Sequence, residues 1–218
     1  MFMSALWDTV FEINENHDNC SVFLIDNSIP ALCFGSTDKP SVYLAGFGSE
    51  DWESSVILLK FFDELLYCAE SGRKMAGIAV KKALEKRGII IVPAVCPKAM
   101  TYERTPVGIK DLTPVAKYLS FHKAGMLFTL SKSGNCLVSP SEKYINGVDT
   151  ETVGNILRAC SKIPASSEKK SIQSDFRRWA EVNIGLPAYS LFLNSQGTAE
   201  IDYNYSLLKE TFLLSALM

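Results

Sequence analysis

The chain has 218 residues, of which 47% are hydrophobic and 21% are charged, and its formal net charge is −2. Such a composition is typical of a globular protein and excludes an intrinsically disordered chain. No run of about 18 apolar residues occurs, so the sequence predicts no membrane span. Because the first residues lack the basic segment of an export signal, we expect a cytoplasmic protein, or a host-intracellular one if it is viral.

Charge is distributed very unevenly along the chain. Residues 1–72, the acidic lobe, hold twelve Asp or Glu and two Lys, whereas residues 73–178, the basic lobe, hold nineteen Lys or Arg and eight acids. Residues 179–218, expected to form a hairpin and a helix, carry four acids and one Lys. This asymmetry predicts either a charged partner or one lobe that neutralises the other.

The acidic lobe contains hydrophobic patterns of both helical and strand type. The most apolar of its segments predicts a nearly buried helix that ends at Ser71-Gly72. In chain order we expect a helix from Ser4, a hairpin of Cys20–Ile25 and Ile29–Phe34, a strand over Ser41–Phe47, and the buried helix over Glu50–Ala69.

The rest of the chain alternates between the same two patterns. We expect helices at 73–87, 113–123, 150–161 and 174–184 and from Ser206, a buried strand that opens at 88–92, and hairpins of 126–130 with 136–138 and of 188–193 with 198–203. A helix followed by a hairpin therefore occurs three times.

These elements predict one compact α+β domain over residues 1–218. Its sheet would be mixed and mainly antiparallel, with helices packed against it. Three α-β-β units could reflect an internal duplication, although such units are common in this fold class.

The junction over residues 45–51 reads Ala-Gly-Phe-Gly-Ser-Glu-Asp, which superficially resembles a phosphate-binding loop. It lacks the third glycine of a dinucleotide fingerprint and the lysine of a P-loop. Glu50, Asp51 and Glu53 also place three carboxylates in the first helical turn, where they would repel a phosphate. We therefore interpret the junction as a helix start, and these three carboxylates as candidate binding residues for a cationic partner.

Catalytic and metal-binding patterns are sparse. The two histidines, His17 and His122, have no second His or Cys at ligand spacing, so we expect neither a metal nor a cofactor. The six cysteines form no CxxC pair and are expected to be reduced. Cys96 at the end of a buried strand could pair with His122 as nucleophile and base, but each residue also fits an ordinary structural role.

The charge pattern led us to expect a non-catalytic interaction protein whose acidic surface binds a protein partner with a basic surface. Immunity proteins, inhibitors and viral or phage accessory proteins have this character. The first alternative is an enzyme that uses Cys96 and His122. The second is nucleic-acid binding by the basic lobe, which is less favoured because few aromatic residues accompany its paired cations, such as Arg177-Arg178.

Overall fold

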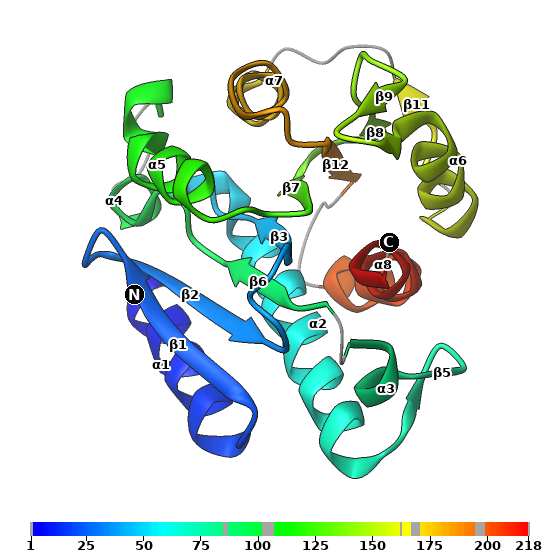
Figure 1. Cartoon of the computed structure of the whole chain (residues 1–218). Coiled ribbons are helices and arrows are strands. Elements are labelled where there is room, and N and C mark those ends of the chain that lie inside the picture. Colours follow the sequence, from blue (N-terminus) through cyan, green and yellow to red (C-terminus); the bar gives the residue numbers. More distant parts are fainter. Residues whose placement is uncertain are drawn as a thin grey trace.

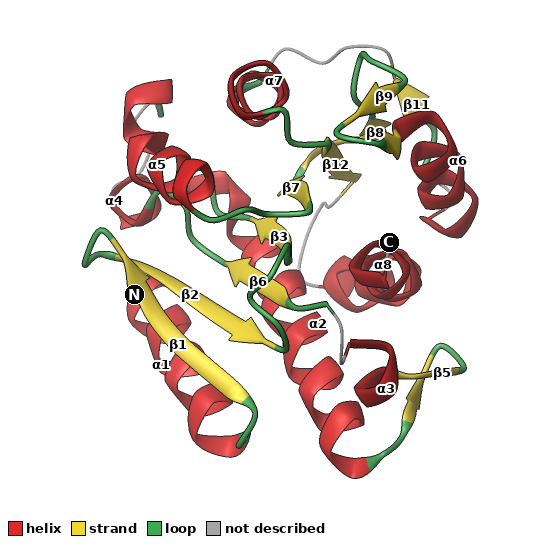
Figure 2. Cartoon of the chain, in the orientation of Figure 1, coloured by secondary structure: helices red, strands yellow, loops and turns green. Residues whose placement is uncertain are grey.

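The computed structural model describes residues 2–84, 87–101, 107–161, 163–166, 171–194 and 199–217. Its main feature is an eight-stranded mixed sheet in the order β1-β2-β6-β3-β7-β12-β8-β11, covered by helices (Figures 1 and 2). The strands are β1 (Cys20–Ile25), β2 (Ile29–Phe34), β3 (Ser41–Leu44), β6 (Ile89–Val92), β7 (Met126–Ser131), β8 (Ser133–Val138), β11 (Ala165–Ser166) and β12 (Ala188–Asn194).

Two small hairpins lie outside this sheet, β4 (Lys74–Met75) with β5 (Ile78–Ala79) and β9 (Tyr144–Ile145) with β10 (Val148–Asp149). The helices are α1 (Phe2–Asn16), α2 (Trp52–Ser71), α3 (Val80–Leu84), α4 (Pro97–Thr101), α5 (Thr113–Phe121), α6 (Thr150–Ser161), α7 (Ile172–Ile184) and α8 (Ala199–Leu217). Two 3-10 turns, η1 (Ser49–Asp51) and η2 (Ile109–Leu112), precede α2 and α5. No helix among the described residues is long and apolar enough to cross a membrane.

The helices form a layer on each face of the sheet. Apolar residues of α1, α2, α6 and α8 belong to one buried cluster, those of α5 and α7 belong to a second, and the short helix α4 contributes to both. The expected buried helix is confirmed, because α2 contributes Phe61 and Phe62 with no exposed surface. On the same face the Tyr43 hydroxyl of β3 donates to the Phe212 carbonyl of α8 at 2.9 Å. These contacts hold the central strands in a fixed position.

The mixed α/β architecture agrees with expectation, but the predominance of antiparallel pairs does not. Among the described residues, β6, β3, β7 and β12 form consecutive parallel pairs, and β8 with β11 is also parallel. Antiparallel pairs join β1 with β2, β2 with β6, and β12 with β8. The reason is that helical crossovers connect the central strands and return the chain in the same direction.

The predicted elements are confirmed where local turn residues determine their boundaries. The first hairpin has the expected bounds, and Asp26 and Asn27 in its turn have φ values of 51° and 55°. Two residues with positive φ are what a tight hairpin turn requires. The end of α2 is also confirmed, since Gly72 has a φ of 68° as its C-cap.

The expected helix over 73–87 is wrong. A hairpin, β4 with β5, precedes the five-residue helix α3. Ala76 and Gly77 form its turn with φ values of 48° and 80°, which interrupts a helix. Residues 85 and 86 of the predicted helix lie outside the described residues.

The second and third expected hairpins are also wrong. Strands β7 and β8 do not pair with each other, because β12 lies between them, parallel to β7 and antiparallel to β8. The chain after β12 enters α8 at Ala199, so the expected strand over 198–203 is helical from Ala199; residue 198 lies outside the described part. Three equivalent α-β-β units are therefore not present.

Candidate functional site

The carboxyl ends of the central parallel strands meet at one edge of the sheet. After β3, Gly46 adopts a φ of +68°, and a Cβ there would lie 2.6 Å from the Pro93 carbonyl oxygen that follows β6. The Val95 amide donates to the Ala45 carbonyl at 3.0 Å. The segments after β3 and β6 are thereby held against each other.

The connections leave this edge in opposite directions. The helix that follows β3, α2, packs into the first apolar cluster, whereas α5, between β6 and β7, packs into the second. In open α/β sheets, ligands bind at the carboxyl ends of strands where the connections diverge in this way. A ligand site is therefore expected at this edge.

Asp51 is the central polar residue at this edge. Its Oδ1 accepts hydrogen bonds from the Ser131 hydroxyl and the Lys132 amide, both at 2.9 Å, and its Oδ2 accepts one from the Gln173 side chain at 2.8 Å. Lys132 also forms a 3.3 Å ion pair from its Nζ to Glu53 Oε1. We call these five residues the Asp51 centre.

Two opposing effects act on the pKa of Asp51. Burial raises it, the hydrogen bonds from Lys132, Ser131 and Gln173 lower it, and burial prevails, so the net shift of the pKa is upward. These donors favour the charged carboxylate. In the same centre, the Lys132 side chain is 32% exposed and that of Glu53 only 2%, so the Lys132 ammonium is the charged group that solvent reaches.

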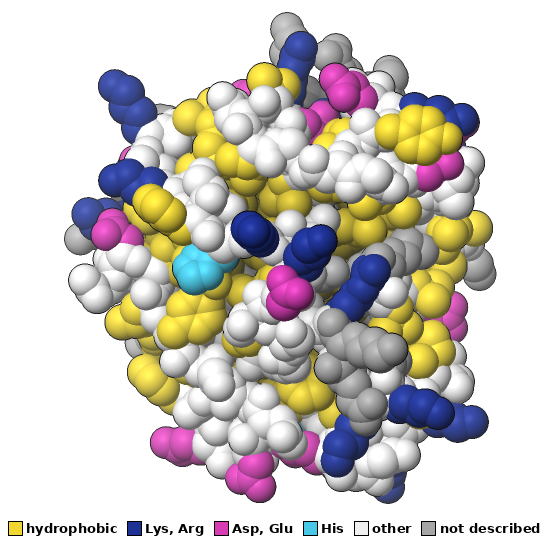
Figure 3. Space-filling model, viewed as in Figure 1, with side chains coloured by type: hydrophobic (Ala, Val, Ile, Leu, Met, Phe, Trp, Pro, Cys, Tyr) yellow, Lys and Arg dark blue, Asp and Glu magenta, His cyan; other side chains and the backbone are white. Residues whose placement is uncertain are grey.

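The three candidate carboxylates do not form an acidic surface together. Glu50 is exposed, but Asp51 and Glu53 are buried. The side chains of Asp51 and Glu53 turn inward. Asp51 accepts hydrogen bonds from donors on β7, after β7 and on α7, and Glu53 pairs with Lys132. Elsewhere in the acidic lobe, Glu64 pairs with Lys209 at 3.6 Å. Figure 3 shows acidic and basic side chains interspersed on the visible face.

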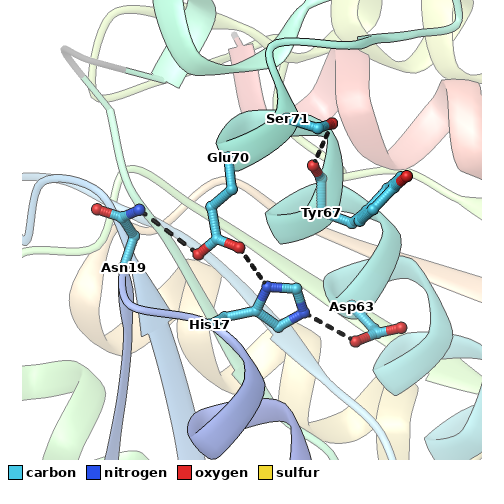
Figure 4. A network of polar contacts seen from close by, with 6 residues as sticks. All are labelled: His17, Asn19, Asp63, Tyr67, Glu70 and Ser71. Atoms are coloured by element: carbon cyan, nitrogen blue, oxygen red, sulfur yellow. Dashed lines mark hydrogen bonds and ion pairs between the residues drawn. The ribbon is translucent and has the colours of Figure 1, made fainter.

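A second polar cluster joins α1 to α2 (Figure 4). The His17 ring lies 2.7 Å from Glu70 through Nδ1 and 3.0 Å from Asp63 through Nε2. Asn19 donates to the other Glu70 oxygen at 3.5 Å. His17 is 8% exposed, whereas Asp63 and Glu70 are 56% and 26% exposed, so the cluster is a partly buried link between two helices. No local pattern marks this cluster, because 46 and 53 residues separate the histidine from its partners.

Cys96 and His122 have different surroundings. Cys96 lies after β6, is buried, and has its pKa raised to about 12 by burial and by the charge of Asp111. His122 is exposed after α5, where its ring stacks on Tyr118 with centroids 4.2 Å apart. It lines a cavity of about 690 Å³ beside the β1-β2 hairpin, and Cys33, not Cys96, is the cysteine in its wall.

No family model and no curated protein matches the sequence. Solved structures do match. Thrombin activatable fibrinolysis inhibitor shares 11% identity, with a TM-score of 0.76 over 98% of this chain and 73% of that one. The fold is that of the metallo-carboxypeptidases. The metallo-carboxypeptidase of Burkholderia cenocepacia matches at 9% identity and a TM-score of 0.69, over 95% of this chain and 67% of that one. Murein-tripeptide amidase from Escherichia coli O157 matches at 11% identity and a TM-score of 0.53, over 86% and 85%.

The name of this fold implies a bound metal ion. The question is whether the side chains of this chain could coordinate one. Among the described residues, no group of three or more His, Cys, Asp or Glu could hold a metal ion. Both oxygens of Asp51 are already engaged by Ser131, Lys132 and Gln173. The residues of the Asp51 centre therefore do not fit a metal site.

The carboxypeptidase fold corrects the expected function. The expectation of a non-catalytic protein of the immunity, inhibitor or viral accessory type is wrong, because solved structures with this fold are named as a metallo-carboxypeptidase and as an amidase. Sequence reasoning also missed Ser131, Lys132 and Gln173. They lie 80 to 122 residues from Asp51, on other elements, so no local spacing marks them.

Proposed function

We propose that the protein is a peptidase-like enzyme that acts on a peptide or a related amide at the Asp51 centre. The observation that carries the proposal is the likeness to solved structures of the carboxypeptidase fold, which extends over 98% of the chain at a TM-score of 0.76. The position of the centre at the carboxyl ends of parallel strands supports it as well.

Lys132 is the residue to which we assign substrate contact. Its ammonium is partly exposed and is held near the edge by the 3.3 Å ion pair with Glu53. A peptide offers two groups that an ammonium can bind, a terminal carboxylate and a carbonyl oxygen. Negative charge develops on that carbonyl oxygen when an amide is attacked, and a fixed cation stabilises it.

Asp51 acts as a positioning residue in this proposal. It accepts the Lys132 backbone amide at 2.9 Å and so fixes the start of the segment that carries the ammonium. Because its oxygens are occupied by donors, it does not itself contact the substrate. No step of the proposed chemistry is assigned to a metal, since the described residues do not fit one.

The test is a screen for hydrolysis with the purified full chain. Short peptides and N-acyl amino acids are incubated with the protein, once with a chelator and once with added Zn²⁺, and free products are detected by mass spectrometry. Turnover that falls about 100-fold in Lys132→Gln, but not in the surface control Lys60→Gln, supports the proposal. Absence of turnover in both arms, even with measurable peptide binding, rejects an enzymatic function.

A further inference from the structure

A basic pocket lies at the opposite end of the sheet from the β1-β2 hairpin. It is formed between the β8-β11 edge and helices α6 and α7, which flank this edge in Figure 1. Its volume is about 460 Å³, which is within the range of small-molecule sites. None of the five residues of the Asp51 centre lines it, so it is a separate feature of the molecule.

Positive charge dominates the wall of this pocket. Among the described residues that line it, four cations face two carboxylates, and a third carboxylate, that of Glu181, is paired with Arg177. Serine and threonine hydroxyls add neutral hydrogen-bonding groups. The charged residues that line the pocket are Lys143, Arg158, Arg177 and Arg178, together with Glu142 and Glu151.

Arg177 is the anchored cation of the group. Its side chain is only 8% exposed, and its Nη1 donates to the Ser139 carbonyl at 3.1 Å and to Glu181. Its Nε is buried without a hydrogen-bond partner. A desolvated guanidinium with an unsatisfied N–H is costly in free energy. An anion in the pocket would offset that cost by adding negative charge beside the guanidinium.

Two other arginines form no ion pair with a carboxylate of the described residues, although the charge of Arg178 acts on Glu181. Arg158 of α6 donates to the Gly154 carbonyl and to Asn155, which are both neutral groups. Arg178 of α7 is exposed and makes no hydrogen bond or ion pair with a described residue. Lys143 differs, because its ammonium lies 3.1 Å from Glu151. The cations of the pocket without an ion pair to a described residue are therefore Arg158 and Arg178, whereas Arg177 is paired with Glu181.

From this arrangement we infer that the pocket binds a small molecule that carries a phosphate group. Cations outnumber carboxylates around the pocket, and the planar guanidinium groups of several arginines suit the oxygens of a phosphate. A phosphate also presents more acceptor oxygens to these groups than a carboxylate does. The phosphate can belong to inorganic phosphate or to a phosphate monoester of a larger molecule, since the pocket has room for both.

The test measures binding to the full chain by calorimetry at low ionic strength. The probes are inorganic phosphate, phenyl phosphate and acetate, and the variant is Arg158→Gln with Arg178→Gln. Both substitutions are on partly or fully exposed side chains, so the fold should be kept, as circular dichroism can verify. The matched control is Lys81→Gln with Lys82→Gln, which removes two exposed cations from α3.

We expect saturable binding of phosphate or phenyl phosphate, weakened at least tenfold in the arginine variant and unchanged in the lysine control. Tighter binding of phenyl phosphate than of phosphate would assign the site to a monoester, and the reverse order would assign it to the free ion. The inference is overturned if neither phosphate probe saturates, if acetate binds as tightly, or if both double variants lose the same affinity.

Discussion

Asp51 and Ser131 are joined by a hydrogen bond of 2.9 Å between Oδ1 and Oγ, although 80 residues separate them in the chain. The bond connects the segment after β3 to the end of β7. The first prediction concerns the stability that this centre supplies. Replacing Asp51 by Asn removes the charged acceptor of three donors, and each hydrogen bond to a charged group contributes about 1.5–3 kcal/mol.

We therefore expect Asp51→Asn to lower the free energy of unfolding by about 3 kcal/mol, measured by urea denaturation. Glu50→Gln, one residue earlier and exposed, is the control and should change it by less than about 0.5 kcal/mol. Equal stability of the two variants would show that the network around Asp51 is not needed for folding.

Alanine substitutions at Gly46 and Gly77 distinguish the destabilisation caused by steric crowding from that caused by backbone strain. Both have positive φ, +68° and +80°, but a Cβ at Gly46 would lie 2.6 Å from the Pro93 carbonyl oxygen, whereas a Cβ at Gly77 would meet nothing within 4 Å. We expect Gly46→Ala to be at least about 1 kcal/mol more destabilising than Gly77→Ala. Thermal unfolding of the two variants measures this difference, and similar melting temperatures would contradict it.

The His17 cluster predicts a pH dependence of stability. Burial lowers the pKa of His17, but the hydrogen bonds and charges of Glu70 and Asp63 raise it more, so the net shift is upward from 6.5. A group whose pKa is raised on folding stabilises the folded state below its unfolded pKa, and this contribution is lost as the pH rises through the folded pKa. The wild type should therefore exceed His17→Gln in stability by more at pH 6 than at pH 9.

Protonation of Glu70, the partner of His17, determines how the stability supplied by the cluster changes at low pH. Its pKa is lowered from 4.5, because its hydrogen bond and ion pair with His17 outweigh the effect of burial. Its contribution is present above pH 4.5 and is lost as the pH falls through the lowered value. The measurement is urea unfolding from pH 3 to pH 9, with His122→Gln as the exposed histidine control. A stability difference that does not vary with pH would refute the charged pair.

Cys96 provides a test of the alternative, raised from the sequence, in which Cys96 and His122 act as nucleophile and base. With its pKa raised to about 12, its thiolate fraction at pH 7 is roughly 10³-fold below that of a thiol with a pKa of 9. Iodoacetamide should therefore label Cys96 far more slowly in the native protein than in urea, as peptide mass spectrometry can show. Rapid native labelling would instead support Cys96 as a nucleophile.

The sequence predicts those elements that short-range chemistry determines. The Asp26-Asn27 turn, the buried pattern of α2 and the cap at Gly72 all act within a few residues, and they are found where expected. The position of β12 between β7 and β8 is different. It depends on pairing between strands about 60 residues apart, which turn signals near Ser133 do not reveal.

In the site, too, the features that depend on nearby residues could be predicted, and those that depend on distant residues could not. The carboxylates at the start of α2 were recognisable as candidates, but whether they face solvent depends on distant partners. Asp51 turns inward because Ser131, Lys132 and Gln173 supply donors from other elements. Net charge counted along the chain cannot distinguish an exposed acid such as Glu50 from a buried one, so it did not show that Asp51 and Glu53 are buried.

The central claim is that the Asp51 centre hydrolyses an amide with Lys132 in contact with the substrate. Its most direct test is kcat/KM for the best peptide found in the screen, compared between wild type and Lys132→Gln, with Lys60→Gln as control. We predict a loss of about 100-fold at Lys132 and none at Lys60. An unchanged kcat/KM in Lys132→Gln would contradict the assignment of the site.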